Sequence, residues 1–148
     1  MTDRPRAIAH AMLTQALAGE PIVAPALVGA DLATAAIWLR ERAAGVLSEA
    51  LRPHELLDLI TMIFESEHPA LPEQDARSRV GTTWQYAAAL EVATAELAGN
   101  GRQADPITVA NLTLDPDGML TALAELTAHL FRLHDGPGAR AVVRALRP

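Results

Sequence analysis

The sequence predicts an all-α protein, a compact bundle of about five to six helices with an extended, proline-containing strap between the first two. Half of the residues are hydrophobic while aromatic residues make up only 3%, and alanine-rich, aromatic-poor chains favour helices packed closely through small side chains. Apolar residues recur at helical spacing almost throughout, and proline and glycine divide the resulting segments. At 148 residues, the chain 1–148 is expected to form a single helical domain with one buried core.

The first helix is expected to run from about Pro5 to Ala18. Proline suits the first helical position because its missing amide needs no partner there, and Gly19 provides a C-terminal stop. Its buried face is predicted to carry Ile8, Met12, Leu13, Ala16 and Leu17.

An apolar strap is predicted to follow this helix. Pro21 and Pro25 cannot both lie inside one helix, because each lacks an amide hydrogen and clashes with the preceding turn. Exposing the large side chains between 21 and 28 would cost about 1.5–3 kcal/mol each, so the strap must lie against something. That surface is either its own bundle or a second subunit, and the candidate interface residues here are Ile22, Val23, Leu27 and Val28.

Asp31 is the predicted N-cap of a second helix, which reaches about Leu51 before Pro53 ends it. A third helix is expected over about 53–67 and a fourth over about 73–98, where the sequence GNG closes it. The core-facing stripe of the second helix is expected to contain Leu32, Ala36, Leu39, Ala43, Val46, Leu47 and Ala50.

The C-terminal third is predicted to begin with about 15 less regular residues, in which Asp105 and Pro106 could cap one short turn. Asp115 and Pro116 then open the fifth main helix, which the sequence DGPG ends. A short last helix over about 139–146 completes the chain. The inward residues of the fifth helix are expected to be Met119, Leu123, Leu126, Leu130 and Leu133.

Trp38 is predicted to lie on a polar side of the second helix, about 130° from its core stripe and on the side of Arg42. Large aromatic residues are enriched at interface anchors, so Trp38 and Arg42 are candidate interface residues. The alternative is that this helix is central and buried on two sides.

The fourth helix is predicted to place Glu91 on an apolar stripe with Trp84. A buried carboxylate needs a cationic or hydrogen-bonding partner, and an arginine or a histidine could serve. A structural ion pair is one reading, and a small-molecule site lined by Trp84, Tyr86 and Glu91 is the other.

Catalytic and metal-binding patterns are sparse, and no catalytic residue, metal ligand or cofactor is predicted. The chain contains no cysteine and no glycine-rich phosphate loop. Glu65 and His68 have the spacing found in di-iron bundles, but that element occurs once where such a site needs it twice. Glu125 and His129 are expected to form a solvated surface pair, and His134 to be partly buried near a helix end.

The last helix carries Arg140, Arg144 and Arg147 at i, i+4 and i+7, beside an apolar edge. A basic helix of this kind can lay its apolar edge in a groove, so 136–148 is a candidate docking tail for a second copy or another protein. The alternative is a helix packed weakly on its own bundle, with its arginines in solvent.

The net charge of −6 argues against general nucleic-acid binding, and no window is apolar for long enough to span a membrane. A cytoplasmic, non-enzymatic interaction and assembly module, forming a homo-oligomer, is therefore the leading hypothesis. One alternative is a small-molecule-binding or enzymatic bundle with the pocket at Glu91. Another is a chaperone or inhibitor-type protein whose apolar strap orders only with its partner.

Overall fold

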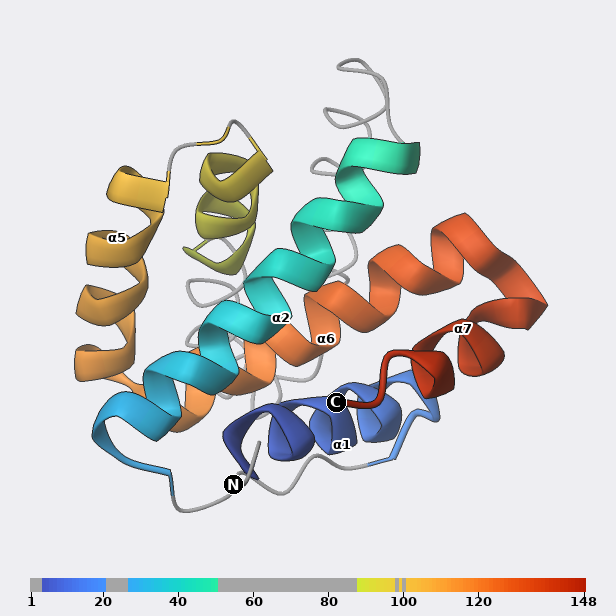
Figure 1. The fold of residues 1–148 in the computed structure, drawn as a ribbon, viewed down its shortest axis with the longest axis horizontal. Coiled ribbons are helices and arrows are strands. Elements are labelled where there is room, and N and C mark those ends of the chain that lie inside the picture. Colours follow the sequence, from blue (N-terminus) through green and yellow to red (C-terminus); the bar gives the residue numbers. More distant parts are fainter. Residues whose placement is uncertain (1–3, 21–26, 51–87, 98, 100) are drawn as a thin grey trace, which may run out of the picture.

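The computed structural model describes residues 4–20, 27–50, 88–97, 99 and 101–148, and every regular element in these ranges is helical (Figure 1). The predicted all-α fold is confirmed. The helix expected over 53–67 and the first half of the one expected over 73–98 lie outside the described residues. The elements are α1 (Arg4–Leu17), α2 (Gly29–Ala50), a helical segment at 88–97, α5 (Gly101–Leu114), α6 (Pro116–Asp135), the 3-10 turn η1 (Gly136–Gly138) and α7 (Ala139–Ala145).

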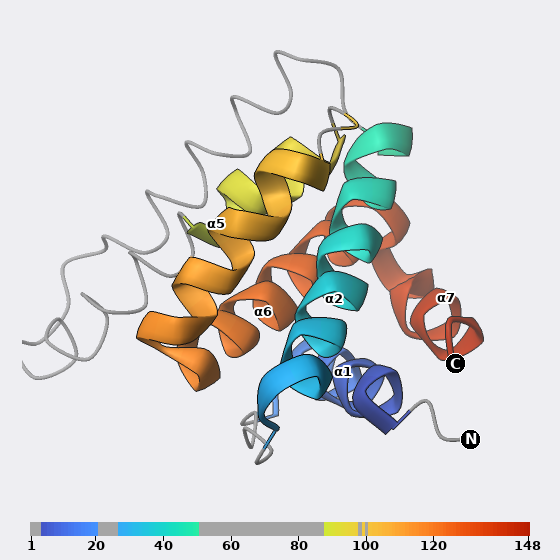
Figure 2. The same ribbon diagram turned by 60° about the vertical axis from the view of Figure 1, so that its left-hand side comes forward.

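Helix α6 lies at the centre of the bundle and packs against α1, α2, α5 and α7 (Figures 1 and 2). Its inward face is almost entirely aliphatic and is fully buried, as the helical spacing of its leucines predicts. Helices α1 and α2 also pack against each other and close the core from one side. The core residues of α6 include Met119, Leu120, Leu123, Leu126 and Leu130.

The ends of α6 follow from its local sequence. The Gly118 amide donates a hydrogen bond to the Asp115 carboxylate at 3.1 Å, and Pro116 occupies the first turn, as predicted. At the other end, Gly136 adopts a φ of 54°, a conformation open to glycine, and its amide bonds to the Arg132 carbonyl.

Helix α1 begins and ends within one residue of its predicted bounds, and its C-terminus is held by a residue from α6. The Arg132 guanidinium donates to the carbonyls of Ala16 and of Leu17, the latter at 2.8 Å. These are among the carbonyls that a helix end leaves without an internal partner. Arg132 therefore joins the end of α1 to the central helix.

The start of α2 was predicted three residues too late. The helix begins at Gly29, whose φ of 58° turns the chain into it, and Asp31 lies inside the first turn rather than at the N-cap. A carboxylate in the first turn is favourable there because it faces the positive end of the helix dipole. Of the predicted strap, 21–26 lies outside the described residues, while Leu27 is buried and Val28 is 79% exposed.

The prediction of an irregular segment before Asp115 was wrong. Residues Gly101–Leu114 form the continuous helix α5, with Pro106 inside it. Proline removes one backbone hydrogen bond and disfavours helical geometry in the preceding residue, which is why the sequence reads as a break. Asp105 and Thr108, on either side of the proline, both bind a buried arginine of α2, and these tertiary contacts hold the helix in place.

Candidate functional site

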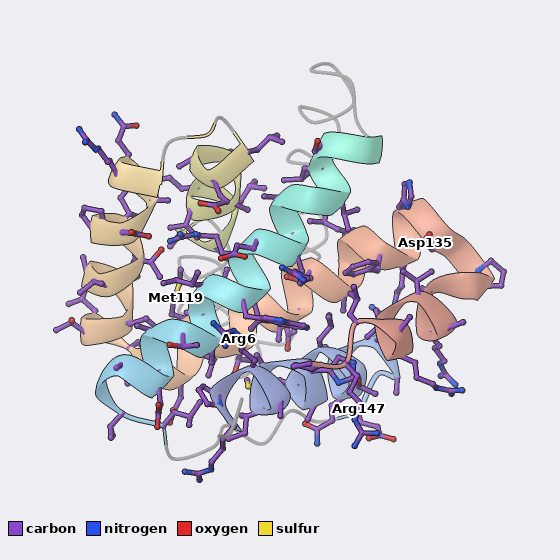
Figure 3. All side chains as sticks on the ribbon, in the orientation of Figure 1. Arg6, Met119, Asp135 and Arg147 are labelled. Carbon is purple, nitrogen blue, oxygen red and sulfur yellow. The ribbon has the colours of Figure 1, made fainter. Side chains whose placement is uncertain are left out.

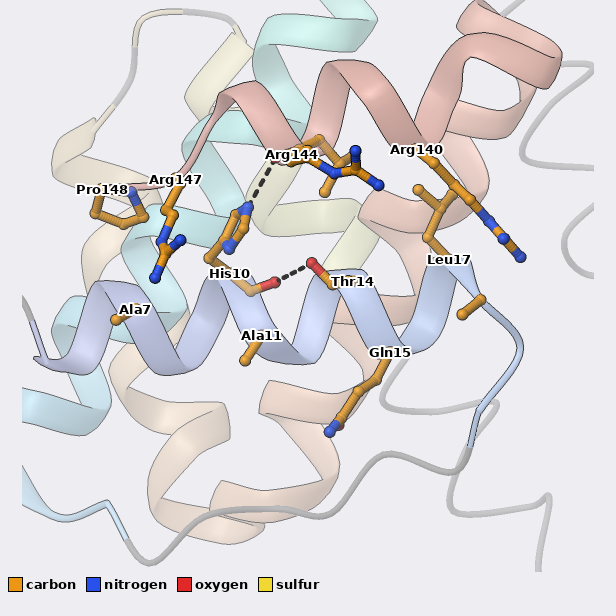
Figure 4. Close-up of a pocket in the computed structure, with 12 residues that line it drawn as sticks. Ala7, His10, Ala11, Thr14, Gln15, Leu17, Arg140, Arg144, Arg147 and Pro148 are labelled. Carbon is orange, nitrogen blue, oxygen red and sulfur yellow. Dashed lines mark hydrogen bonds between the residues drawn. The ribbon is translucent and has the colours of Figure 1, made fainter.

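A groove open to solvent, with a volume of about 850 Å³, runs between α1 and α7 (Figure 4). Its α1 wall presents small side chains, with Ala7, Ala11, Thr14 and Ala18 spaced one turn apart. The remaining lining residues are His10, Gln15, Leu17, Arg140, Val143, Arg144, Arg147 and Pro148.

Helix α7 is anchored beside this groove by a contact between distant parts of the chain. The His10 Nε2 donates to the Val143 carbonyl at 2.7 Å, and the Val143 side chain is buried in the core. Leu146, at the end of the helix, also packs against the core. Two apolar side chains and one hydrogen bond therefore place α7 along α1, rather than leaving it as a separate tail.

Three arginines form the α7 side of the groove, and we call Arg140, Arg144 and Arg147 the arginine row. All three are exposed, and Figure 4 shows Arg140 and Arg144 on α7 and Arg147 just after its end; Arg147 is also labelled in Figure 3. Within the described ranges, none of the three forms an ion pair. The structure thus brings these predicted interface residues together on one face, opposite the small residues of α1.

A second charged cluster lies inside the bundle, where α2, the segment 88–97 and α5 meet. Arg40 is only 3% exposed, and its Nη2 lies 2.8 Å from Asp105 Oδ1 and 3.3 Å from Glu96 Oε2. Its Nη1 donates to the Thr108 hydroxyl at 3.0 Å, and that hydroxyl donates in turn to the Ala104 carbonyl. Arg40 Nε is buried with no hydrogen-bond partner among the described residues. This cluster joins three helical segments and is structural.

No family model matches the chain, and comparisons with curated proteins and with solved structures give no match either. Among the helices that the structure describes, none is both long and apolar enough to cross a membrane.

Arg40 was among the arginines expected to pair with a buried carboxylate, but its own burial was not predicted, although the signal was present. The residue lies four positions after Ala36 and three before Ala43, both assigned to the core stripe of α2. A residue with such neighbours must share their buried face. The carboxylates of two other segments compensate its buried charge.

The predicted burial of Glu91 was wrong. The side chain is exposed, and the buried ion pair expected for it is formed instead by Glu96, one and a half turns further along the same segment. Trp84 and Tyr86 lie outside the described residues, so the pocket predicted around these three residues is not brought together by the described part of the chain.

Trp38 is buried rather than exposed on a polar face. It is 6% exposed, its ring meets the His10 ring edge-on at 6.0 Å, and the Arg42 guanidinium lies 5.2 Å from its centroid. Helix α2 is thus covered on two sides, the alternative left open by its sequence. An interface role for Arg42 stays a prediction, while Trp38 is a buried residue of the core.

Of the candidate interface residues in the strap, Ile22 and Val23 lie outside the described residues.

The histidines differ from their predicted settings. His129 is half-buried, with its Nε2 inaccessible and unpartnered within the described structure, whereas a solvated pair with Glu125 was predicted. His134 is exposed rather than partly buried, and its Nδ1 lies 3.1 Å from Asp135 Oδ1. Over the ranges that the structure covers, no three carboxylates or histidines gather closely enough to hold a metal ion.

The setting of His129 predicts a pH dependence of stability. Burial lowers the pKa of His129 below its ordinary value of 6.5, and the nearby Arg132 guanidinium lowers it further. The folded state therefore resists a proton that the unfolded chain accepts. The stabilisation from a neutral His129 is complete above pH 6.5 and is lost as the pH falls from 6.5 towards the lower pKa of the folded state.

We expect the free energy of unfolding to fall more steeply below pH 6.5 in the wild type than in His129→Gln, measured by urea denaturation between pH 8 and pH 5. Glutamine keeps a polar side chain but cannot titrate, and all other titrating groups are common to both proteins. Parallel pH profiles would show that the His129 pKa is the same in the folded and unfolded states.

Proposed function

We propose that the protein is a non-enzymatic helical interaction module, which assembles with other protein chains through the groove between α1 and α7. The observation that carries this proposal is the arginine row, which is exposed and makes no ion pair in the described structure of a chain whose net charge is −6. Because the chain has no cysteine, we also propose a reducing, cytoplasmic setting.

The chemistry of arginine supports a protein partner. A guanidinium group is always charged, is weakly hydrated and presents donors in a planar fork that matches a carboxylate. Ala7, Ala11 and Ala18 are exposed and supply apolar surface on the α1 side of the groove. Protein interfaces combine these features, with arginines enriched and apolar surface at the centre.

Self-association is the first form of this function to test. We expect a molar mass above the 15.7 kDa of one chain in light scattering across a concentration series, and a decrease in mass as salt screens the arginines. Replacing all three arginines of the row by glutamine is expected to lower the mass, while the helical circular dichroism stays unchanged because these side chains are exposed.

The matched control is Arg102→Gln, because Arg102 is an exposed arginine of α5 that does not line the groove. Its molar mass is expected to equal that of the wild type. A mass of one chain at every concentration would contradict self-association. A multimer that keeps its mass in the glutamine variant would contradict assembly through the arginine row.

A further inference from the structure

We propose that α7 undocks from the bundle as one unit, by a hinge motion at η1, while the rest of the described fold stays intact. Helix α7 lies at the edge of the bundle and is joined to α6 through η1 (Figures 1 and 2). Because α7 carries one wall of the groove, its undocking takes the groove apart without unfolding the protein. This motion requires no partner, so it goes beyond the proposed function.

Helix α7 is too weak to stay helical without its contacts. It has 7 residues, whereas isolated helices shorter than about 12 to 15 residues are marginal in water. Its N-cap, Gly138, provides no side-chain hydrogen bond, and its first turn contains no acidic residue. Arg140 and Arg144 place like charges four residues apart, which disfavours a helix, although Arg144 is favourably placed in the last turn. The helix therefore forms only while it is docked.

Few groups hold α7 on the bundle. Ala139 and Val143 are buried in the core, and every other residue of the helix is exposed. Leu146, just after the helix, packs against the core, and the His10 Nε2 bond to the Val143 carbonyl ties α7 to α1 at 2.7 Å. The central helix α6, in contrast, has buried side chains along its whole length. Undocking α7 therefore costs less free energy than unfolding the bundle.

The turn η1 can serve as the hinge. Gly136, Pro137 and Gly138 are exposed, and a side chain added at either glycine would meet nothing within 4 Å. Hinges are a few residues that absorb large changes in backbone dihedral angles, and glycine does so at low steric cost. Rotation about η1 therefore breaks no buried contact of the turn itself.

The test is native-state hydrogen exchange of the full chain, followed by NMR at several low urea concentrations. We expect the amides of 143–146 to share one opening free energy, with protection at least about tenfold lower than at Leu123 and Leu126 in the core of α6. The urea dependence at 143–146 is expected to be smaller than in α6, because undocking exposes less surface than global unfolding.

Two variants separate undocking from global unfolding. Leu112→Val weakens the core at α5, on the side of the bundle away from α7 (Figure 1). It is expected to speed exchange about three- to tenfold in α6 and not in α7, because the packing of Leu112 persists when α7 undocks. His10→Phe keeps a ring beside Trp38 and removes the donor to Val143. It is expected to speed exchange by a similar factor in both helices, because the lost bond stabilises only the docked state.

Equal protection and equal urea dependence in α6 and α7 would overturn the proposal, as would a Leu112→Val effect of the same size in both helices. Exchange at 143–146 without any urea dependence would indicate fraying residue by residue, and would also overturn it. A complete lack of protection at 143–146 would show that α7 is not docked at all. The molar mass measured for the proposed function is independent of each of these results.

Discussion

The variant Glu96→Gln/Asp105→Asn is expected to lose about 3 kcal/mol of unfolding free energy, more than the variant Arg40→Met loses. In the double variant the arginine remains buried at 3% exposure without a counter-charge, and an uncompensated buried charge is costly. Glu96 and Asp105 are 24% and 59% exposed, so they regain water when the arginine is removed. Their partial exposure places the expected loss at the low end of the range for buried pairs.

Arg40→Met keeps the volume of the side chain and removes the unpartnered Nε, so its cost is expected to be about 1 kcal/mol or less. Urea denaturation followed by circular dichroism measures both variants. A larger loss for Arg40→Met than for the double variant would mean that the ion pairs stabilise the fold by more than the desolvation of Arg40 costs. The single variants Glu96→Gln and Asp105→Asn would then show which carboxylate is responsible.

Trp38→Glu is expected to cost more than about 4 kcal/mol, enough to unfold a domain of ordinary stability at mild temperature. The substitution removes a large buried side chain and its contacts with His10 and Arg42, and it introduces a carboxylate at a position that is 6% exposed. The measurement is the midpoint of thermal unfolding, with Trp38→Phe expected to lie between the wild type and Trp38→Glu.

Val109→Glu is the matched control, because Val109 is 54% exposed on α5 and a charge there meets water. Its effect is expected to stay within about 0.5 kcal/mol. A folded Trp38→Glu protein with nearly wild-type stability would show that Trp38 is accessible and would restore it as a candidate interface anchor. If Trp38→Glu is instead strongly destabilised, a lower molar mass of this variant would be caused by unfolding. A substitution of Arg42 would then be the better test of whether this side of α2 is an interface.

The central helix shows how much local sequence can decide. Asp115, Pro116 and Gly136 set the ends of α6, because capping and backbone conformation depend on neighbouring residues alone. The helical repeat of Met119, Leu123 and their successors selected the buried face for the same reason. The arginine row was also predictable, since Arg140, Arg144 and Arg147 follow one another at intervals of four and three residues in the sequence.

Helix α5 shows what local sequence could not decide. Pro106 is a true local signal against a helix, and it was outweighed by the contacts of Asp105 and Thr108 with Arg40, some 65 residues away in the chain. A second contact between distant segments, the ion pair of Arg40 with Glu96, could not be predicted from local sequence either. Helical spacing had placed Glu91 rather than Glu96 at the buried position.

By itself, the sequence determined the helical class, the ends and inner face of α6, and the arginine row, since each depends on residues within a few turns of one another. Only the tertiary structure decided that α5 is a helix, that Trp38 is covered, and that the arginine row faces the small residues of α1. Those outcomes depend on which segments meet in space. Whether a charge or an aromatic ring is buried depends on residues from other segments of the chain, and the helical periodicity of one segment carries no information about them.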